Sequence, residues 1–349
     1  MKPVQTYNLA KETKIEVIDR FQLILEIFAR RASTKEAQLQ IQLAKLKYEL
    51  AHAKERVKLA KMEEQPGFMG LGAYEVDVYY EAVKRQIHTI QGKLKKIRKK
   101  RSLHRKRRAE LGFTTISLAG YTNAGKSSLF NALTEENVRV DIGLFTTLST
   151  TTRIIDLFGK KALLTDTVGF IDRLPLSLIE AFHSTLEETI FSDLILLVLD
   201  LSEPEDMIKK KLSCCLDTIE KIGATGIPIV TVLNKIDLLS KEKVEQKVEL
   251  LKNEAQNIVP LSALHKTNID ALKSELTNFL KPYIQVSFIL PINDGSLSFL
   301  SHLFTHANVQ KVDYEGDSMS VIFEAVPEFA DYVKGCVEKL DGAIKAVNQ

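Results

Sequence analysis

A single eight-residue stretch constrains the fold of this 349-residue chain more than any other feature. Residues 120–127 read Gly-Tyr-Thr-Asn-Ala-Gly-Lys-Ser, and they lie between a β-type run at 113–118 and a helical pattern. G-x-x-x-x-G-K-S in that context is typical of a loop that wraps phosphate groups, because its glycines let successive amides point inward and the following helix adds its dipole. We expect Lys126 to reach the terminal phosphates and the Ser127 hydroxyl to ligate magnesium. The predicted phosphate loop comprises Gly120, Tyr121, Thr122, Asn123, Ala124, Gly125, Lys126, Ser127 and Ser128.

A second motif follows a short apolar strand at 162–164. It reads Asp166-Thr167-Val168-Gly169, and D-x-x-G arises by chance in most chains of this length, so its position carries the argument. An aspartate at a strand end some forty residues after a phosphate loop is where P-loop NTPases support magnesium through its outer ligands. Gly169 is expected to offer its amide to the terminal phosphate and to move when that phosphate leaves.

A third motif predicts which base is bound. The run Ile229–Leu233 leads into Asn234-Lys235-Ile236-Asp237, and the Asp237 carboxylate is expected to accept two hydrogen bonds from the edge of guanine. Adenine has no matching pair of donors, and a buried carboxylate left unpaired costs a few kcal/mol. Farther along, Ser262 and Ala263 provide an amide for the keto oxygen of the base. The order of these motifs favours GTP over ATP.

The segment between the phosphate loop and Asp166 is rich in threonine. A threonine hydroxyl that closes on magnesium is expected in residues 144–153, although a β-branched strand with one polar face explains the same composition. The candidates for contact with the nucleotide are Phe145, Thr146, Thr147, Leu148 and Ser149.

Two helical stripes precede the phosphate loop. Apolar residues recur in steps of three and four over 39–60 and again over 83–97, while Pro66 and three glycines interrupt residues 65–72. The pattern predicts an antiparallel helical hairpin. Ser33, with Glu36 three residues later, resembles a capping box at the start of the first helix.

The second stripe runs into a strongly basic segment. Residues 93–110 contain eleven Lys or Arg and one acidic residue, whereas the whole chain has a formal charge of only +3. Such a concentration is typical of a surface that binds a polyanion, and nucleic acid fits better than lipid because the segment lacks a leucine-rich and aromatic face. A solvated helix face is the plain alternative.

Composition excludes several other classes. The longest apolar run, at 194–199, is far shorter than the roughly 20 residues of a membrane-spanning helix. Three cysteines make no disulfide framework, and the first residues show no export signal. We therefore expect a cytoplasmic protein without a membrane span.

The last sixty-six residues are expected to form a separate unit. Strands are predicted at 284–290, 308–314 and 318–325, and helices at 294–306 and 328–347. This order predicts a small α/β sandwich, in which we find no catalytic group.

Together these segments resemble the HflX family of ribosome-associated GTPases. The resemblance rests on GYTNAGKSSLFNAL, LFTTLSTTTR, DTVGFIDRLPLSLIEAFHSTLEET and NKID, and on the upstream residues 17–50. It implies a translational GTPase that uses GTP and magnesium and binds the ribosome, mainly the large subunit. It also implies that Thr147, the second residue after Phe145, contacts magnesium with Ser127. Phe170 stands where Ras-type enzymes keep a water-orienting glutamine, which implies slow hydrolysis that needs a partner surface.

The expected fold class is α/β, with a P-loop GTPase core built on a mixed, mostly parallel sheet. The expected domains are residues 1–33, a remnant of the family's N-terminal lobe; 34–112, the basic hairpin; 113–283, the GTPase domain; and 284–349, the small α/β domain. We expect a monomer in which Lys126, Thr147 and Gly169 serve catalysis and the hairpin contacts ribosomal RNA of the large subunit.

Three departures from the family pattern leave the biological role open. Fewer than thirty residues precede Arg30, where the family usually has a further lobe; the hairpin turn carries Phe68, Met69 and Leu71; and Ser149 and Thr150 stand where aspartate and proline are common. Besides ribosome splitting, rescue or recycling, the chain fits a GTP-regulated RNA-binding or remodelling module, or a GTP-sensing adaptor. The sequence does not determine whether ATP is also used.

Overall fold

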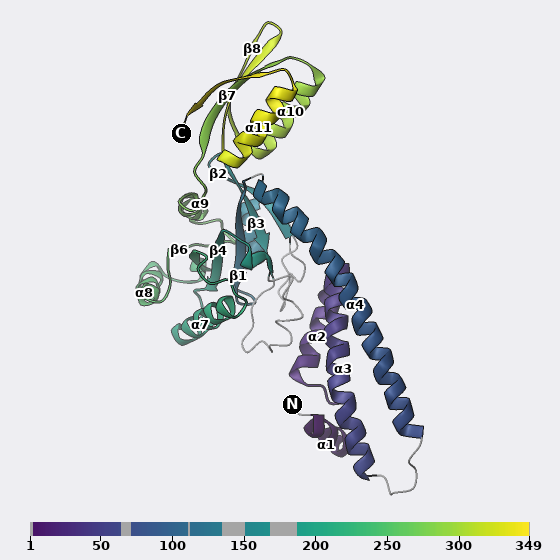
Figure 1. The fold of residues 1–349 in the computed structure, drawn as a ribbon. Coiled ribbons are helices and arrows are strands. Elements are labelled where there is room, and N and C mark those ends of the chain that lie inside the picture. Colours follow the sequence, from purple (N-terminus) through teal and green to yellow (C-terminus); the bar gives the residue numbers. More distant parts are fainter. Residues whose placement is uncertain (1–2, 64–70, 111, 135–150, 168–186, 349) are drawn as a thin grey trace.

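The computed structural model describes residues 3–63, 71–110, 112–134, 151–167 and 187–348 of the chain (Figure 1). Helices form an elongated N-terminal part, a six-stranded sheet lies in the middle, and a four-stranded sheet with two helices lies at the far end. Within the described ranges, no helix combines the length and the apolar character that crossing a bilayer requires.

The N-terminal part consists of α1 (Pro3–Thr13), α2 (Arg20–Arg31), α3 (Lys35–Glu63) and α4 (Leu71–Glu110). Helix α3 lies between α2 and α4 and is apolar on two sides (Figure 1). One side packs on Phe28 of α2, and the other meets the stripe of α4 that includes the buried Val83 and Ile90. The predicted antiparallel hairpin is confirmed, and its predicted turn at 65–72 falls largely outside the described residues.

The predicted cap of α3 was wrong by one residue. The helix begins at Lys35, and the hydroxyl of Thr34, rather than Ser33, accepts a hydrogen bond from the Ala37 amide at 3.3 Å. A complete capping box instead begins α2, where the Asp19 side chain and Gln22 exchange hydrogen bonds with each other's backbone amides. The Asp19 carboxylate also accepts from the Tyr48 hydroxyl at 2.9 Å, which ties α2 to α3.

The central domain contains a six-stranded sheet in the order β2-β3-β1-β4-β5-β6, with only β2 antiparallel to its neighbour. Helices α5 and α9 cover one face of the sheet, and α7 and α8 cover the other. The strands are β1 (Thr114–Gly120), β2 (Thr151–Leu157), β3 (Lys160–Asp166), β4 (Leu194–Asp200), β5 (Ile229–Asn234) and β6 (Ile258–Pro260). The helices are α5 (Lys126–Thr134), α7 (Glu205–Lys221), η1 (Ile236–Leu238), α8 (Lys241–Leu251) and α9 (Ile269–Thr277). The strands β1 and β4 are buried almost throughout because both faces of the sheet are covered, and β4 is apolar up to Asp200.

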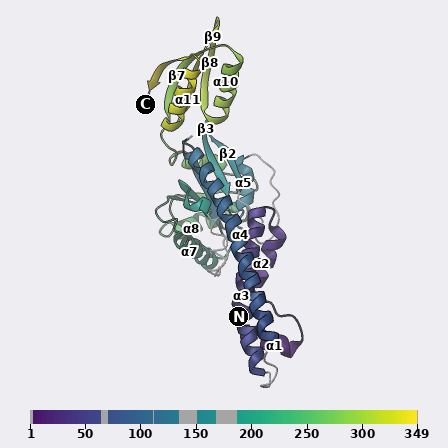
Figure 2. The ribbon, with the colours of Figure 1, turned by 45° about the vertical axis from the view of Figure 1, so that its right-hand side comes forward.

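The C-terminal domain has the order β-α-β-β-α-β, and its antiparallel sheet runs β10-β7-β9-β8. Its elements are β7 (Ile284–Pro291), α10 (Asp294–His306), β8 (Asn308–Glu315), β9 (Ser318–Ala325), α11 (Pro327–Lys339) and β10 (Ala343–Asn348). This is the ferredoxin-like arrangement, in which both helices pack on one face of the sheet (Figure 2). The predicted α/β class and the small C-terminal α/β unit are confirmed.

The predicted helix over 328–347 was wrong in its second half. Helix α11 ends at Lys339, Asp341 adopts a left-handed φ of 57°, and the Gly342 amide donates to the Val337 carbonyl at 2.9 Å. A Cβ at Gly342 would lie 2.6 Å from the Ile289 carbonyl oxygen, so the chain passes too close to β7 for any side chain. Residues 343–348 then pair with β7 as a fourth strand. A local sequence pattern could not reveal this strand, because its partner lies more than fifty residues earlier.

Candidate nucleotide site

The predicted phosphate loop joins β1 to α5, as its glycines require. Gly120 has a φ of 143° and Gly125 a φ of 94°, conformations that residues with a side chain rarely adopt. A Cβ at Gly120 would lie 2.3 Å from the Val198 carbonyl oxygen, and one at Gly125 would lie 2.1 Å from Asn234 Nδ2. Both glycines are therefore needed for close packing as well as for the turn. The loop ends at the first turn of α5, where backbone amides without a helical partner and the helix dipole favour the binding of an anion.

Lys126 is buried within this loop. Its ammonium group donates hydrogen bonds to the carbonyl oxygens of Gly120 at 3.1 Å and Tyr121 at 2.9 Å. Burial lowers the pKa of Lys126, while the charge of Asp166 acts in the opposite direction. The residue thus places a cation beside the backbone amides of the loop, which is the arrangement that a phosphate chain needs.

Two oxygen donors lie side by side next to the loop. Because β1 and β3 pair in parallel with Leu118 opposite Asp166, the Asp166 carboxylate ends beside α5, and the Ser127 hydroxyl donates to its Oδ2 at 3.5 Å. The neighbouring Thr167 is fully buried and donates to the Leu118 carbonyl at 2.5 Å, which fixes the chain where it leaves β3. A hydroxyl and a carboxylate next to a phosphate site are the hard oxygen ligands that magnesium prefers, so the residues present fit this ion.

The predicted base motif lies at the end of β5. Buried Asn234 donates through Nδ2 to the Ala124 carbonyl at 2.9 Å and accepts through Oδ1 from the Ala263 amide at 3.0 Å. One side chain therefore joins the phosphate loop, the base motif and the loop after β6. The side chain of Asp237 is 18% exposed, and its Oδ2 lies 3.9 Å from Nε2 of His265. Ser262 is fully buried and accepts from the His265 amide at 3.2 Å, which shapes that last loop.

The structure brings together most of the predicted site. From the phosphate loop, the end of β3, the base motif and the loop after β6, the residues that lie in the described part are Gly120–Ser128, Asp166, Thr167, Asn234, Lys235, Ile236, Asp237, Ser262 and Ala263. Phe145, Thr146, Thr147, Leu148, Ser149, Val168 and Gly169 lie outside the described residues, so their place at the site stays a prediction.

Sequence reasoning missed one carboxylate at the site. Asp200 ends β4 directly opposite Asn234, and its Oδ2 accepts a hydrogen bond from the Lys235 ammonium at 2.6 Å. The sequence feature that could have indicated Asp200 is its position at the end of an apolar strand, because that strand lies next to the strand of the base motif. Recognising it required the strand order, because β4 and β5 are neighbours in the sheet but lie some thirty residues apart in the chain.

Sequence reasoning also missed the role of three arginines in the basic segment. Arg98, Arg101 and Arg105 share one face of α4, and that face turns toward the protein. Arg98 and Arg105 form ion pairs with Glu187 at 3.5 Å, and Arg105 reaches Glu188 at 3.6 Å. The Arg105 guanidinium also stacks over the Phe191 ring, with 4.4 Å to the centroid.

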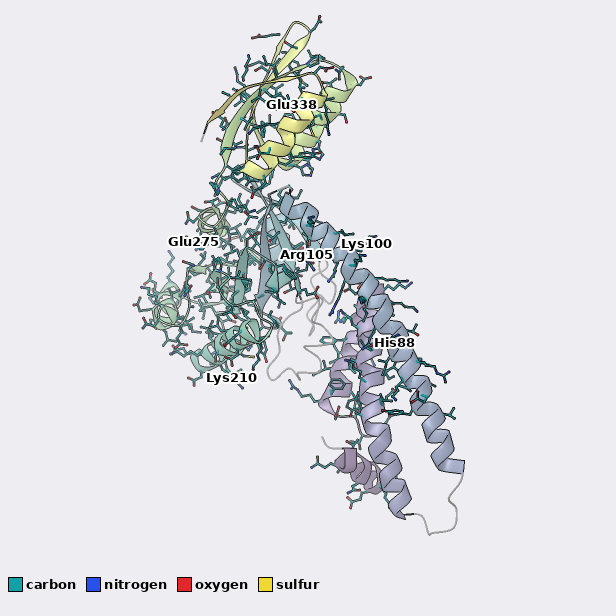
Figure 3. The ribbon with its side chains drawn as sticks, in the orientation of Figure 1. His88, Lys100, Arg105, Lys210, Glu275 and Glu338 are labelled. Carbon is teal, nitrogen blue, oxygen red and sulfur yellow. The ribbon has the colours of Figure 1, made fainter. Side chains whose placement is uncertain are left out.

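Arg101 continues the same face of α4 and pairs with Glu36 of α3 at 3.4 Å. In Figure 3, Arg105 lies against the central domain and Lys100 on the outer side of α4. The arginine spacing of three and four residues was the signal that could have revealed this face.

Comparisons with known proteins agree with this geometry. Residues 115–235 match the family described as "50S ribosome-binding GTPase", residues 31–108 match "GTP-binding GTPase Middle Region", and residues 1–29 match "GTP-binding GTPase N-terminal". A sheet of this order, with a phosphate loop and a guanine motif at the ends of its strands, defines a P-loop GTPase.

Two relatives identify the family, and one solved structure is similar to this chain. "GTPase HflX" of Methanocaldococcus jannaschii is 47% identical over 93% of this chain and 79% of its own length. "GTPase HflX" of Magnetococcus marinus is 34% identical over 97% of this chain and 78% of its own length. The solved complex of SsGBP with GDP is 31% identical, covers 80% of this chain and 78% of that one, and superposes with a TM-score of 0.51. The chain belongs to the HflX family of GTPases.

Proposed function

We propose that this GTPase acts on the ribosome: it binds GTP with magnesium, docks on the large subunit through its basic hairpin and hydrolyses GTP slowly until the ribosome stimulates it. The process it serves is ribosome splitting, rescue or recycling in the cytoplasm. In this proposal residues 34–112 face ribosomal RNA, residues 113–283 switch with the nucleotide, residues 284–349 form an accessory domain, and the chain acts as a monomer. The observation that carries the proposal is a guanine-nucleotide site in a domain whose Glu187 forms ion pairs with the helix that carries the basic segment.

The proposed site roles follow from the contacts around the phosphate loop. Loop amides and Lys126 hold the phosphates, and the Ala263 amide and the Asp237 carboxylate read the base. Ser127, with Thr147 from the sequence prediction, would hold magnesium, which neutralises phosphate charge when it is bound. Gly169 is proposed to sense the terminal phosphate, and slow hydrolysis is expected because Phe170 replaces a water-orienting side chain.

The proposed RNA-binding surface is the outer side of α4. Its exposed cations include six lysines of the basic segment: Lys93, Lys95, Lys96, Lys99, Lys100 and Lys106. Arg101 and Arg105 are largely covered where they form their ion pairs and Arg98 is half exposed, whereas these lysines present their charge to solvent and to partners. Lysine side chains at such spacing contact phosphates without reading sequence, which suits a structured ribosomal RNA.

GTP turnover by the purified chain, with and without large ribosomal subunits, tests the proposal. We expect stimulation by about tenfold or more at moderate salt, a barrier reduction of about 1.4 kcal/mol or more. Lys126→Ala serves as the blank for contaminating GTPases.

Normal GTP binding without stimulation would reject ribosome dependence. Tight, salt-sensitive affinity for free RNA would then favour an RNA-remodelling module, and capture of a protein partner without ribosomal RNA would favour an adaptor.

A further inference from the structure

The loop that follows β4 holds a carboxylate beside the base motif. Asp200 is only 8% exposed, and its Oδ2 lies 2.6 Å from the ammonium nitrogen of Lys235, the second residue of that motif. The backbone brings the two together because β4 and β5 run in parallel with Asp200 opposite Asn234. Lys235 itself has a left-handed φ of 68°, so the backbone leaves the strand direction where the motif turns toward Asp237.

The other carboxylate oxygen of Asp200 is occupied by separate donors. Oδ1 accepts from the Ser202 amide at 3.0 Å and from the Ser202 hydroxyl at 2.5 Å. Since each oxygen has its own partners, the plane of the carboxylate is fixed independently of Lys235. A charged acceptor fixed in this way forms stronger hydrogen bonds than a mobile surface carboxylate.

The backbone of the loop is fixed from the opposite side. The ammonium group of Lys247 on α8 donates to the carbonyl oxygens of Leu201 at 2.8 Å and Glu203 at 2.7 Å. Glu203 in turn pairs with Lys211 of α7 at 2.5 Å, and the Lys211 ammonium lies over the Tyr121 ring, 4.6 Å from its centroid. One loop is therefore tied to the base motif at one end and to the phosphate loop at the other.

We propose that Asp200 is a positioning residue for nucleotide binding: it holds the Lys235 side chain in place before the guanine nucleotide arrives. A free lysine side chain carries about 2 kcal/mol of rotamer entropy, and a ligand that must order it binds more weakly. Asp200 removes that cost in advance. The inference rests on the proposed assignment of the base site and adds a residue outside the N-K-x-D motif.

The test compares Asp200→Asn with the wild-type chain by titration of GTP and GDP and by steady-state turnover. The substitution keeps the size of the side chain and an acceptor for Ser202 but removes the negative charge. We expect both affinities to fall about tenfold, with KM rising and kcat at saturating GTP unchanged, because the reacting phosphate is not touched. The matched control is Asp206→Asn, an exposed carboxylate at the start of α7, which should bind as the wild type does.

A double-mutant cycle separates positioning from a general structural role. In a Lys235→Met background, Asp200→Asn should change GTP affinity by less than about twofold, because its effect passes through Lys235. Inosine triphosphate lacks the exocyclic amine that Asp237 is proposed to read, so Asp200→Asn should weaken GTP and inosine triphosphate equally. An Asp237 variant should instead lose the preference between them.

The outcomes distinguish this inference from the proposed site. Failure of the wild-type chain to bind GTP would overturn the site and the inference together. Normal GTP binding by Asp200→Asn would overturn the inference alone, as would an equal loss of affinity with and without Lys235.

Discussion

The nucleotide site and the basic hairpin use the same kinds of charged residue for opposite purposes. At the site, cations are held by fixed partners: the buried Lys126 donates to two backbone carbonyls, and the partly buried Lys235 donates to Asp200. On α4, the lysines of the basic segment are exposed along the outer side, while Arg98, Arg101 and Arg105 pair with Glu36 and Glu187. Cations beside the ends of the strands are therefore held by groups of the protein itself, whereas the lysines on the outer side of α4 are exposed to a binding partner.

The largest expected effect comes from removing the buried cation. Lys126→Ala should lower GTP affinity by about a thousandfold or more, because the phosphates lose a desolvated partner and two loop carbonyls lose their donor. Titration with a fluorescent GTP analogue measures this loss. Lys221→Ala, an exposed lysine at the end of α7, is the control and should change nothing. Unaltered affinity in Lys126→Ala would mean that the loop does not bind phosphates.

The next effect concerns the identity of the base. Asp237→Asn should weaken GTP binding by about a hundredfold and strengthen binding of xanthosine triphosphate, because the amide donates where the carboxylate accepted. Competition between the two nucleotides gives the ratio directly. A variant that still strongly prefers GTP would contradict the assignment of Asp237.

A smaller effect is expected at the hairpin, and it should leave the site untouched. Replacing Lys95, Lys96, Lys99 and Lys100 together with glutamine should weaken binding to the large subunit and lower the slope of log affinity against log salt by about three units. GTP affinity should stay at the wild-type value. Four glutamine replacements at Lys221, Lys241, Lys243 and Lys252 provide a control of equal charge change. Equal losses from both sets would mean that net charge, not this surface, governs binding.

The smallest effect separates the two kinds of cation on α4. Arg105→Met should destabilise the chain by about 1–2 kcal/mol, because Glu187 and Glu188 lose a partner and Phe191 loses a stacked guanidinium. Thermal unfolding measures the change. Lys106→Met, one residue later and exposed, should leave the melting temperature nearly constant. A similar decrease in both variants would show that the inward face of α4 is not special.

Motifs with fixed spacing were predictable because their chemistry is local. The phosphate loop, the strand before it and the guanine motif all follow from residues adjacent in the chain, and Gly120 and Gly125 adopt the backbone conformations that such a loop demands. The two hairpin helices were predictable for a similar reason, since a stripe with steps of three and four has no other regular solution.

Contacts between distant segments could not be predicted from the sequence. The Asp200–Lys235 pair depends on the register of β4 with β5, and the Arg105–Glu187 pair depends on where α4 meets the central domain. The error at 343–348 has the same origin, because pairing with β7 outweighed a helical pattern. The cap at Thr34 shows a smaller limit: two neighbouring hydroxyl residues are equally suitable, and only the backbone decides between them.

The continuity of α4 gives the molecule a mechanical property. The helix comprises forty residues without interruption, and at 1.5 Å per residue it is about 60 Å long. Its base is clamped at Glu187, and the other end of the helix points away from the sheet (Figure 1). About 40 Å of helix separates Leu71 from Arg98 at the clamp, so a rotation of about 5° there would move Leu71 by about 3–4 Å. The hairpin can thus act as a lever arm: a small rotation of α4 at its ion pairs with Glu187 would produce a larger displacement at the distant end of the hairpin.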